Sequence, residues 1–178
     1  MRNMTYLTPS PGGHEPERAQ SAKRKKPEIK NKYLMLGNPT AIQGLKDILE
    51  ECWHRQGFVC PPALTQYITQ ILADKLDKNP WQPEPSYAER YMQLKTPREA
   101  LELGNTCFFT RSVFPTLGQR RGIASSYYVS IGQGCYDHVL RYSQLEPVKI
   151  LKDHFEYCAE MTWTAVHAHG ELREFWDL

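Results

Sequence analysis

The sequence contains no run of apolar residues that approaches the ~18 needed for a membrane helix. Its amino terminus lacks the apolar segment of a secretory signal, so we expect neither membrane insertion nor export. It also lacks a C-x-x-C pair, and its five cysteines are an odd number spread along the chain. This pattern argues against a disulfide framework and favours reduced thiols in a cytoplasmic protein.

The length leaves room for one ordinary domain and a tail, because the chain has 178 residues. That length excludes a multidomain machine. Hydrophobic residues make up 40% of the sequence and charged residues 24%, and the mean hydropathy is −0.59. This balance is typical of a globular protein that buries a core and stays in solution.

A net charge of +2 conceals a basic amino-terminal segment. Residues 1–33 carry eight Lys or Arg residues and three Glu residues, a net charge of +5, whereas residues 34–178 carry fourteen basic and seventeen acidic residues, a net charge of −3. The segment is rich in Pro and Gly and poor in aliphatic residues, so it cannot bury enough apolar surface to offset the entropy of ordering. We predict a disordered basic tail over residues 1–32 and a helical domain over residues 33–178.

Two amphipathic helices are predicted directly after the tail. The first begins at Pro39, behind a capping Asn38, and ends near Gly57, which can adopt the left-handed conformation of a helix end. The second begins at Pro62 and stops before Asn79, and apolar residues recur at helical spacing through both.

Two capping boxes follow, because Ser86 and Thr96 each precede a Glu by three residues. Their separation predicts a short helix and then a longer one over residues 97–114. The longer helix is apolar on nearly every side, so we expect it to be central in the fold, with Gly104 allowing a neighbour to approach closely.

The last third of the chain gives one ambiguous and one clear element. Residues 125–142 fit a helix, although residues 127–131 would also fit a strand. We favour the helix because no second strand signal exists to pair with that segment. Residues 147–170 predict a single long helix from the recurrence of their apolar positions. The fold prediction is therefore all-α, a compact bundle of about six helices.

Residues 101–140 contain a set of short motifs: Leu103-Gly104-Asn105, Cys107-Phe108-Phe109, Phe114-Pro115, Ser126-Tyr127-Tyr128 and Gly134-Cys135-Tyr136. This pattern resembles an uncharacterised family of bacterial all-helical proteins. The resemblance implies a bacterial, helical, cytoplasmic protein, and it implies no chemistry because that family has no assigned activity. The basic tail lies outside the pattern.

Basic side chains are the main candidates for binding. In the tail they form a flexible polycation that could neutralise phosphates through counterion release or dock on an acidic protein. In the helical domain, arginines near Phe108, Tyr127 and Tyr128 could stack on bases. The alternative, which we prefer, places those aromatics in the core and the arginines at a helix end. The candidates are Lys23, Arg24, Lys25, Lys26, Lys30, Lys32, Arg111, Arg120 and Arg121.

The sequence gives fewer signals for metal-binding or catalytic residues than for binding surfaces. Glu51 and His54 have the i, i+3 spacing of ligands in di-iron helical bundles, but only one copy is present. His154 and Cys158 are four residues apart and could form a nucleophilic pair. However, Cys158 lies within an apolar stripe, where a buried thiol is inert. We predict no cofactor, no metal and no catalytic residue.

These observations predict a non-enzymatic interaction protein that docks on a larger protein or nucleoprotein complex, with the basic tail as an electrostatic tether. A protein partner is expected, nucleic acid is a second partner through the tail, and no membrane is involved. Two alternatives stay open: a nucleic-acid-binding regulator, and a helical-bundle metalloenzyme that uses Glu51 and His54.

Overall fold

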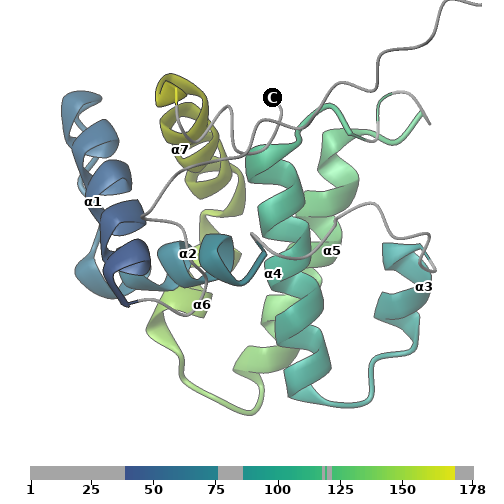
Figure 1. Ribbon diagram of the computed structural model, residues 1–178. Helices are drawn as coiled ribbons and strands as arrows, with labels where there is room; N and C mark the ends of the chain where they lie inside the picture. Colours follow the sequence, from purple (N-terminus) through teal and green to yellow (C-terminus); the bar gives the residue numbers. More distant parts are fainter. Residues whose placement is uncertain (1–38, 76–85, 118, 120–121, 171–178) are drawn as a thin grey trace, which may run out of the picture. The chain divides into compact units, whose positions relative to one another are not determined.

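The computed structural model describes residues 39–75, 86–117, 119 and 122–170, all within the unit of residues 31–178. The predicted tail of residues 1–32 lies outside the described residues. The described part is helical and contains no strand, which confirms an all-α bundle of about six helices (Figure 1). No described helix is long and apolar enough to cross a membrane. The seven helices of this part are α1 (Pro39–Arg55), α2 (Pro62–Lys75), α3 (Tyr87–Met92), α4 (Pro97–Val113), α5 (Ser125–Leu140), α6 (Glu146–Asp153) and α7 (Phe155–Ala168).

The first two helices begin at the prolines that the sequence indicated, and α1 packs against both α2 and α7. The side chains of Leu49 and Trp53 are buried on its inner face. The indole N–H of Trp53 donates a hydrogen bond to the carbonyl of Met161 in α7, at 3.1 Å. After α1 the chain turns at Gly57, whose φ of +75° is the left-handed conformation expected there.

Both predicted capping boxes are present, at the starts of α3 and α4. The Ser86 hydroxyl accepts from the Glu89 N–H at 3.3 Å, and the Ser86 N–H donates to the Glu89 carboxylate at 2.8 Å. Thr96 and Glu99 repeat this exchange at 3.2 and 3.1 Å. Each box satisfies N–H groups that a first helical turn leaves unpaired, so these two boundaries are set by local sequence.

The central helix is α4, as predicted, and it packs against α2, α3, α5 and α7 (Figure 1). Its closest approach is to α5. A Cβ on Gly104 would lie 2.8 Å from Cε1 of Tyr136 in α5, and a Cβ on Gly132 in α5 would lie 2.4 Å from Cε2 of Phe155. The contact at Gly104 confirms the close approach predicted there, whereas Gly132 leaves room mainly for Phe155 of α7.

The ambiguous segment is helical, since α5 covers Ser125–Leu140. The strand alternative for residues 127–131 is wrong. Tyr128, Cys135 and Val139 are buried at helical spacing, and the close fit of α5 against α4 outweighs the strand propensity of five residues.

The single helix predicted over residues 147–170 is wrong, because the chain forms α6 and α7 with a break at His154. His154 has φ −127° and ψ 33°, outside the helical region. The hydrogen bonds continue across it, from the His154 N–H to the Ile150 carbonyl at 2.8 Å and from the Cys158 N–H to the His154 carbonyl at 2.9 Å. The break is therefore a kink. It lets α6 pack against α2 and α5 while α7 packs against α1 and α4, and the apolar periodicity of the sequence is the same on both sides of it.

Candidate functional site

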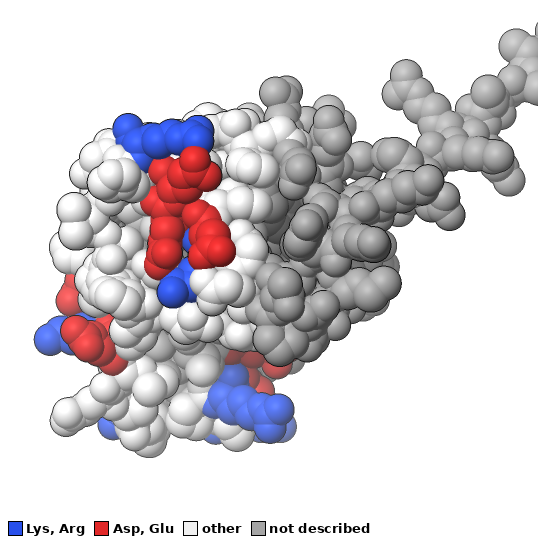
Figure 2. Space-filling view, turned by 60° about the vertical axis from the view of Figure 1, so that its left-hand side comes forward, with Lys and Arg blue, Asp and Glu red and all other residues white. Residues whose placement is uncertain are grey.

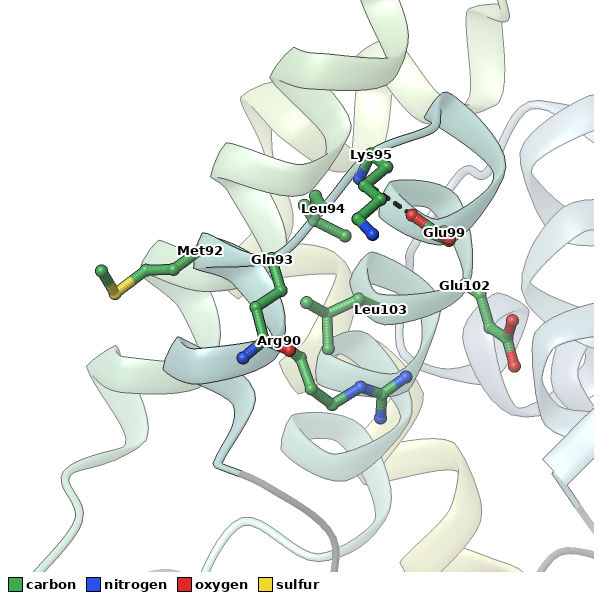
Figure 3. Close-up of a pocket in the computed structure, with 8 residues that line it drawn as sticks. All are labelled: Arg90, Met92, Gln93, Leu94, Lys95, Glu99, Glu102 and Leu103. Atoms are coloured by element: carbon green, nitrogen blue, oxygen red, sulfur yellow. Dashed lines mark hydrogen bonds between the residues drawn. The ribbon is translucent and has the colours of Figure 1, made fainter.

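A groove with a volume of about 600 Å³ opens between α3 and α4 (Figure 3). Leu94 and Leu103 form its apolar floor, and Leu103 is buried. Met92 projects from the rim with 85% of its surface exposed. We call this feature the α3–α4 groove, and it is lined by Arg90, Met92, Gln93, Leu94, Lys95, Glu99, Glu102 and Leu103.

Local sequence creates this groove by ending α3 and restarting the chain as α4 within four residues. The Glu99 carboxylate accepts from the backbone N–H groups of Lys95 and Thr96, at 2.9 and 3.1 Å. These bonds to the backbone of Lys95 and Thr96 lower the pKa of Glu99, so the carboxylate is held in its charged form at the base of the turn. The turn thereby keeps Leu94 over Leu103 instead of letting α3 continue.

Tyrosine side chains fasten α3 to the rest of the bundle, because α3 itself has no buried residue. The Tyr127 hydroxyl accepts a hydrogen bond from the Ala88 N–H at 2.9 Å. The hydroxyls of Tyr87 and Thr110 lie 3.2 Å apart, within hydrogen-bond distance. Tyr91 covers Gly134, where an added Cβ would lie 2.7 Å from its Oη. The outer wall of the groove therefore depends on a few side-chain contacts.

Charges of both signs line the groove. The positive charge of Arg90 acts on the buried core beside it: burial raises the pKa of Cys135 to about 12, and Arg90 opposes that rise. In Figure 3 the Arg90 side chain runs below Leu103 in the view, and Glu102 projects from α4. The lining of the groove thus holds two basic side chains, Arg90 and Lys95, and two acidic ones, Glu99 and Glu102.

Among the predicted binding residues, Arg111 is the one whose side chain the structure describes. Its side chain is only 10% exposed and pairs with Glu156, and a second carboxylate, on Glu160, lies 3.7 Å away. Phe108 and Tyr128 are buried in the core. The six tail residues, Arg120 and Arg121 lie outside the described residues, so binding through them stays a prediction.

The predicted metal candidates lie on the exposed side of α1, near a group of acidic residues. Figure 2, in which the α1 side comes forward, shows acidic side chains gathered between basic ones. Glu51 pairs with Arg55, and Glu50 lies 3.5 Å from Lys46. His54 is exposed. No group of three His, Cys, Asp or Glu side chains in the described residues is placed to hold a metal ion.

The structure does not support His154 and Cys158 as a nucleophilic pair, because the thiol of Cys158 is not activated. Burial, with a smaller contribution from Cys60, raises the pKa of Cys158 to about 11. His154 is exposed at the kink between α6 and α7. A thiol with a raised pKa is a poor nucleophile at neutral pH, so Cys158 acts as a core residue.

Thiol reactivity gives a first prediction, because Cys60 is half-buried and the other four cysteines are buried. We expect one thiol per native chain to react with a chromogenic disulfide reagent, and all five to react after unfolding. Burial raises the pKa of Cys60, so at pH 8 its thiolate fraction is below that of an ordinary cysteine and its rate should keep rising at higher pH. Cys60→Ser should abolish the native reaction, whereas Cys52→Ser should leave it unchanged. Two or more native thiols reacting would contradict the burial of the others.

The groove residues Met92, Leu94 and Lys95 were not predicted as functional. A signal for them exists in the sequence, since two capping boxes ten residues apart force a short helix and a tight turn. An apolar side chain within such a turn has few neighbours to bury it. Which long helix the turn faces depends on tertiary packing and cannot be read from spacing.

No protein-family model matches the chain, and no curated protein or solved structure is similar enough to count as a match. The resemblance of residues 101–140 to a bacterial helical family stays a prediction. The function must therefore be inferred from this protein's own side chains.

Proposed function

We propose that this protein is a non-enzymatic helical interaction protein that docks on a larger protein or nucleoprotein complex through the α3–α4 groove. The observation that carries this proposal is the combination of a groove of about 600 Å³ between two helices and an 85% exposed methionine, Met92, on its rim. Methionine is flexible and polarizable, and it is common on surfaces that bind other proteins. A groove between two helices is also a usual receptor for an amphipathic segment.

The chemistry of the titratable side chains supports the same function. Glu99 caps a helix and Arg111 is paired within the bundle. All five cysteines are free thiols, which supports the proposed cytoplasmic location. The basic tail is proposed as a tether that raises the local concentration of the groove near its partner.

Site-specific photo-crosslinking of the full chain tests this function. A photoreactive amino acid at Met92 should capture a defined protein that the same group at Lys149, an exposed residue of α6, does not capture. Because Met92 is exposed, Met92→Glu should leave the fold intact and reduce capture from a second groove position, Gln93, by about tenfold. Lys149→Glu is the matched control and should change nothing.

Identical capture at Met92 and Lys149, or capture of nucleic acid alone, would overturn the proposal. Nuclease treatment distinguishes a direct protein partner from capture through nucleic acid, because the crosslink to a direct protein partner survives the treatment. Nuclease-sensitive capture would instead favour the nucleic-acid-binding alternative.

A further inference from the structure

We infer that residues 86–94, which comprise α3 and the start of the turn after it, form a flap that detaches from the bundle as one unit while α4 and α5 stay folded. This inference goes beyond the proposed function, because it holds whether or not the groove binds a partner. Detachment removes the α3 wall of the groove, so the closed fraction of the flap sets how often the groove is present.

Little apolar burial holds α3 in place. The helix has six residues, none of them buried, and it packs against α4 and α5 at the right-hand edge of the bundle in Figure 1. The side chains of Tyr91 and Met92 are exposed. Segments with few buried apolar contacts open at a lower free energy than the whole protein. A helix this short is also unstable alone, so α3 is expected to unwind when it detaches.

The backbone hydrogen bonding changes from α3 to α4 between Leu94 and Lys95. The Leu94 N–H donates to the Tyr91 carbonyl of α3 at 3.4 Å, whereas the Lys95 N–H donates to the Glu99 carboxylate of α4 at 2.9 Å. The capping box of Thr96 and Glu99 completes the first turn of α4 from its own residues. The start of α4 therefore keeps its hydrogen bonds when α3 leaves, and the hinge of the flap lies at this point.

Tyrosine side chains hold the flap closed. The Tyr127 hydroxyl of α5 accepts a hydrogen bond from the Ala88 N–H at 2.9 Å. The ring of Tyr87 in α3 meets the ring of Tyr128 in α5 edge-on, with centroids 5.6 Å apart. A single hydrogen bond contributes modestly to stability, because water replaces it when the contact opens. The closed state therefore depends on contacts that single substitutions can weaken.

Hydrogen exchange of the full chain at increasing urea concentration tests the flap. The reporters are the N–H groups of Arg90 and Gln93, which donate to the carbonyls of Ser86 and Glu89 at 3.0 and 3.1 Å. We expect both reporters to show one common opening constant, at least about a hundredfold larger than that of amides in the middle of α4. This constant should depend only weakly on urea, since opening exposes little surface.

Tyr127→Phe tests the contact between the flap and α5. The substitution removes the acceptor of the Ala88 N–H, so the opening constant of the two reporter amides should rise about fivefold, although neither reporter bonds to Tyr127. Tyr157→Phe is the matched control. It removes the hydroxyl of an exposed tyrosine in α7 and should leave the opening constant unchanged.

Gly134→Ala weakens the closed flap from the α5 side by a different route. An added Cβ would lie 2.7 Å from Tyr91 Oη, so Tyr91 must shift and the opening constant should again rise, by about fivefold. Alanine also favours the helical state of α5, so the urea midpoint of global unfolding should not fall. Opening of the flap and unfolding of the bundle are thereby expected to respond in different directions.

A common opening constant for the α3 reporters that rises in both variants, while the middle of α4 keeps its protection, supports the flap. Three results are inconsistent with it. They are exchange of the reporters only through global unfolding, unequal constants that indicate fraying from one end, and a constant that stays unchanged in either variant.

Discussion

Replacing Gly132 with alanine is expected to destabilise the protein by about 2 kcal/mol. The added methyl group would lie 2.4 Å from Cε2 of Phe155 and 3.2 Å from Cβ of Cys107. Phe155 cannot move aside freely, because it is buried and its ring packs against Phe108 and Tyr136, with ring centroids 5.5 and 6.1 Å away. Alanine favours a helix over glycine by about 1 kcal/mol, which offsets part of the cost of overpacking.

Urea unfolding followed by circular dichroism measures this change, and Gly44→Ala is the matched control. Gly44 lies in α1, and a Cβ there would meet nothing within 4 Å. That substitution should therefore stabilise the protein by about 0.5–1 kcal/mol, since only the helix propensity changes. If Gly132→Ala were as stable as Gly44→Ala, then Phe155 of α7 would not pack against α5 as closely as described.

The contact between α4 and α5 shows which features of the fold the local sequence can predict. Gly104 and Cys107 in α4 face Cys135 and Gly132 in α5, so each glycine meets a cysteine of the other helix. Sequence alone indicates that Gly104 admits a close neighbour. It does not indicate which helix supplies that neighbour, because glycine spacing carries no information about partners.

Capping boxes and prolines predicted most helix starts, because their hydrogen bonds form within four residues of the boundary. The kink at His154 was not predicted because it depends on residues far away in the sequence. Apolar positions keep their period from α6 into α7, and only the different neighbours of the two helices require a bend. The α3–α4 groove is also a consequence of packing, since it exists only where α3 rests on its tyrosine contacts.

Arg111 was predicted from sequence as a candidate for binding, and its surroundings lead to a second large effect. The double substitution Glu156→Gln and Glu160→Gln is expected to destabilise the protein by about 2–4 kcal/mol, because it leaves a buried guanidinium without a carboxylate. Arg111→Met should cost only about 1 kcal/mol, although it alters the more buried residue. Methionine fills similar space and removes Arg111 Nε, which is buried and has no hydrogen-bond partner among the described residues. The two carboxylates it releases are 46% and 64% exposed and can be hydrated.

Urea unfolding of the three proteins measures this asymmetry. Asp137→Asn, which alters the partly exposed ion pairs of Asp137 with Arg141 and Lys152, is the control with an expected change below about 1 kcal/mol. Added salt should change the difference in unfolding free energy between these variants only slightly, because the Arg111 charge is shielded from solvent. The same variants separate a structural role from a binding role. If Arg111 only joins α4 to α7, Arg111→Met should keep partner capture at Met92. If Arg111 contacts the partner, the same substitution should abolish capture at Met92 while leaving stability nearly intact. If Arg111→Met proved more destabilising than the double glutamine variant, the ion pair would contribute net stability and the cost would not lie in the stranded charge.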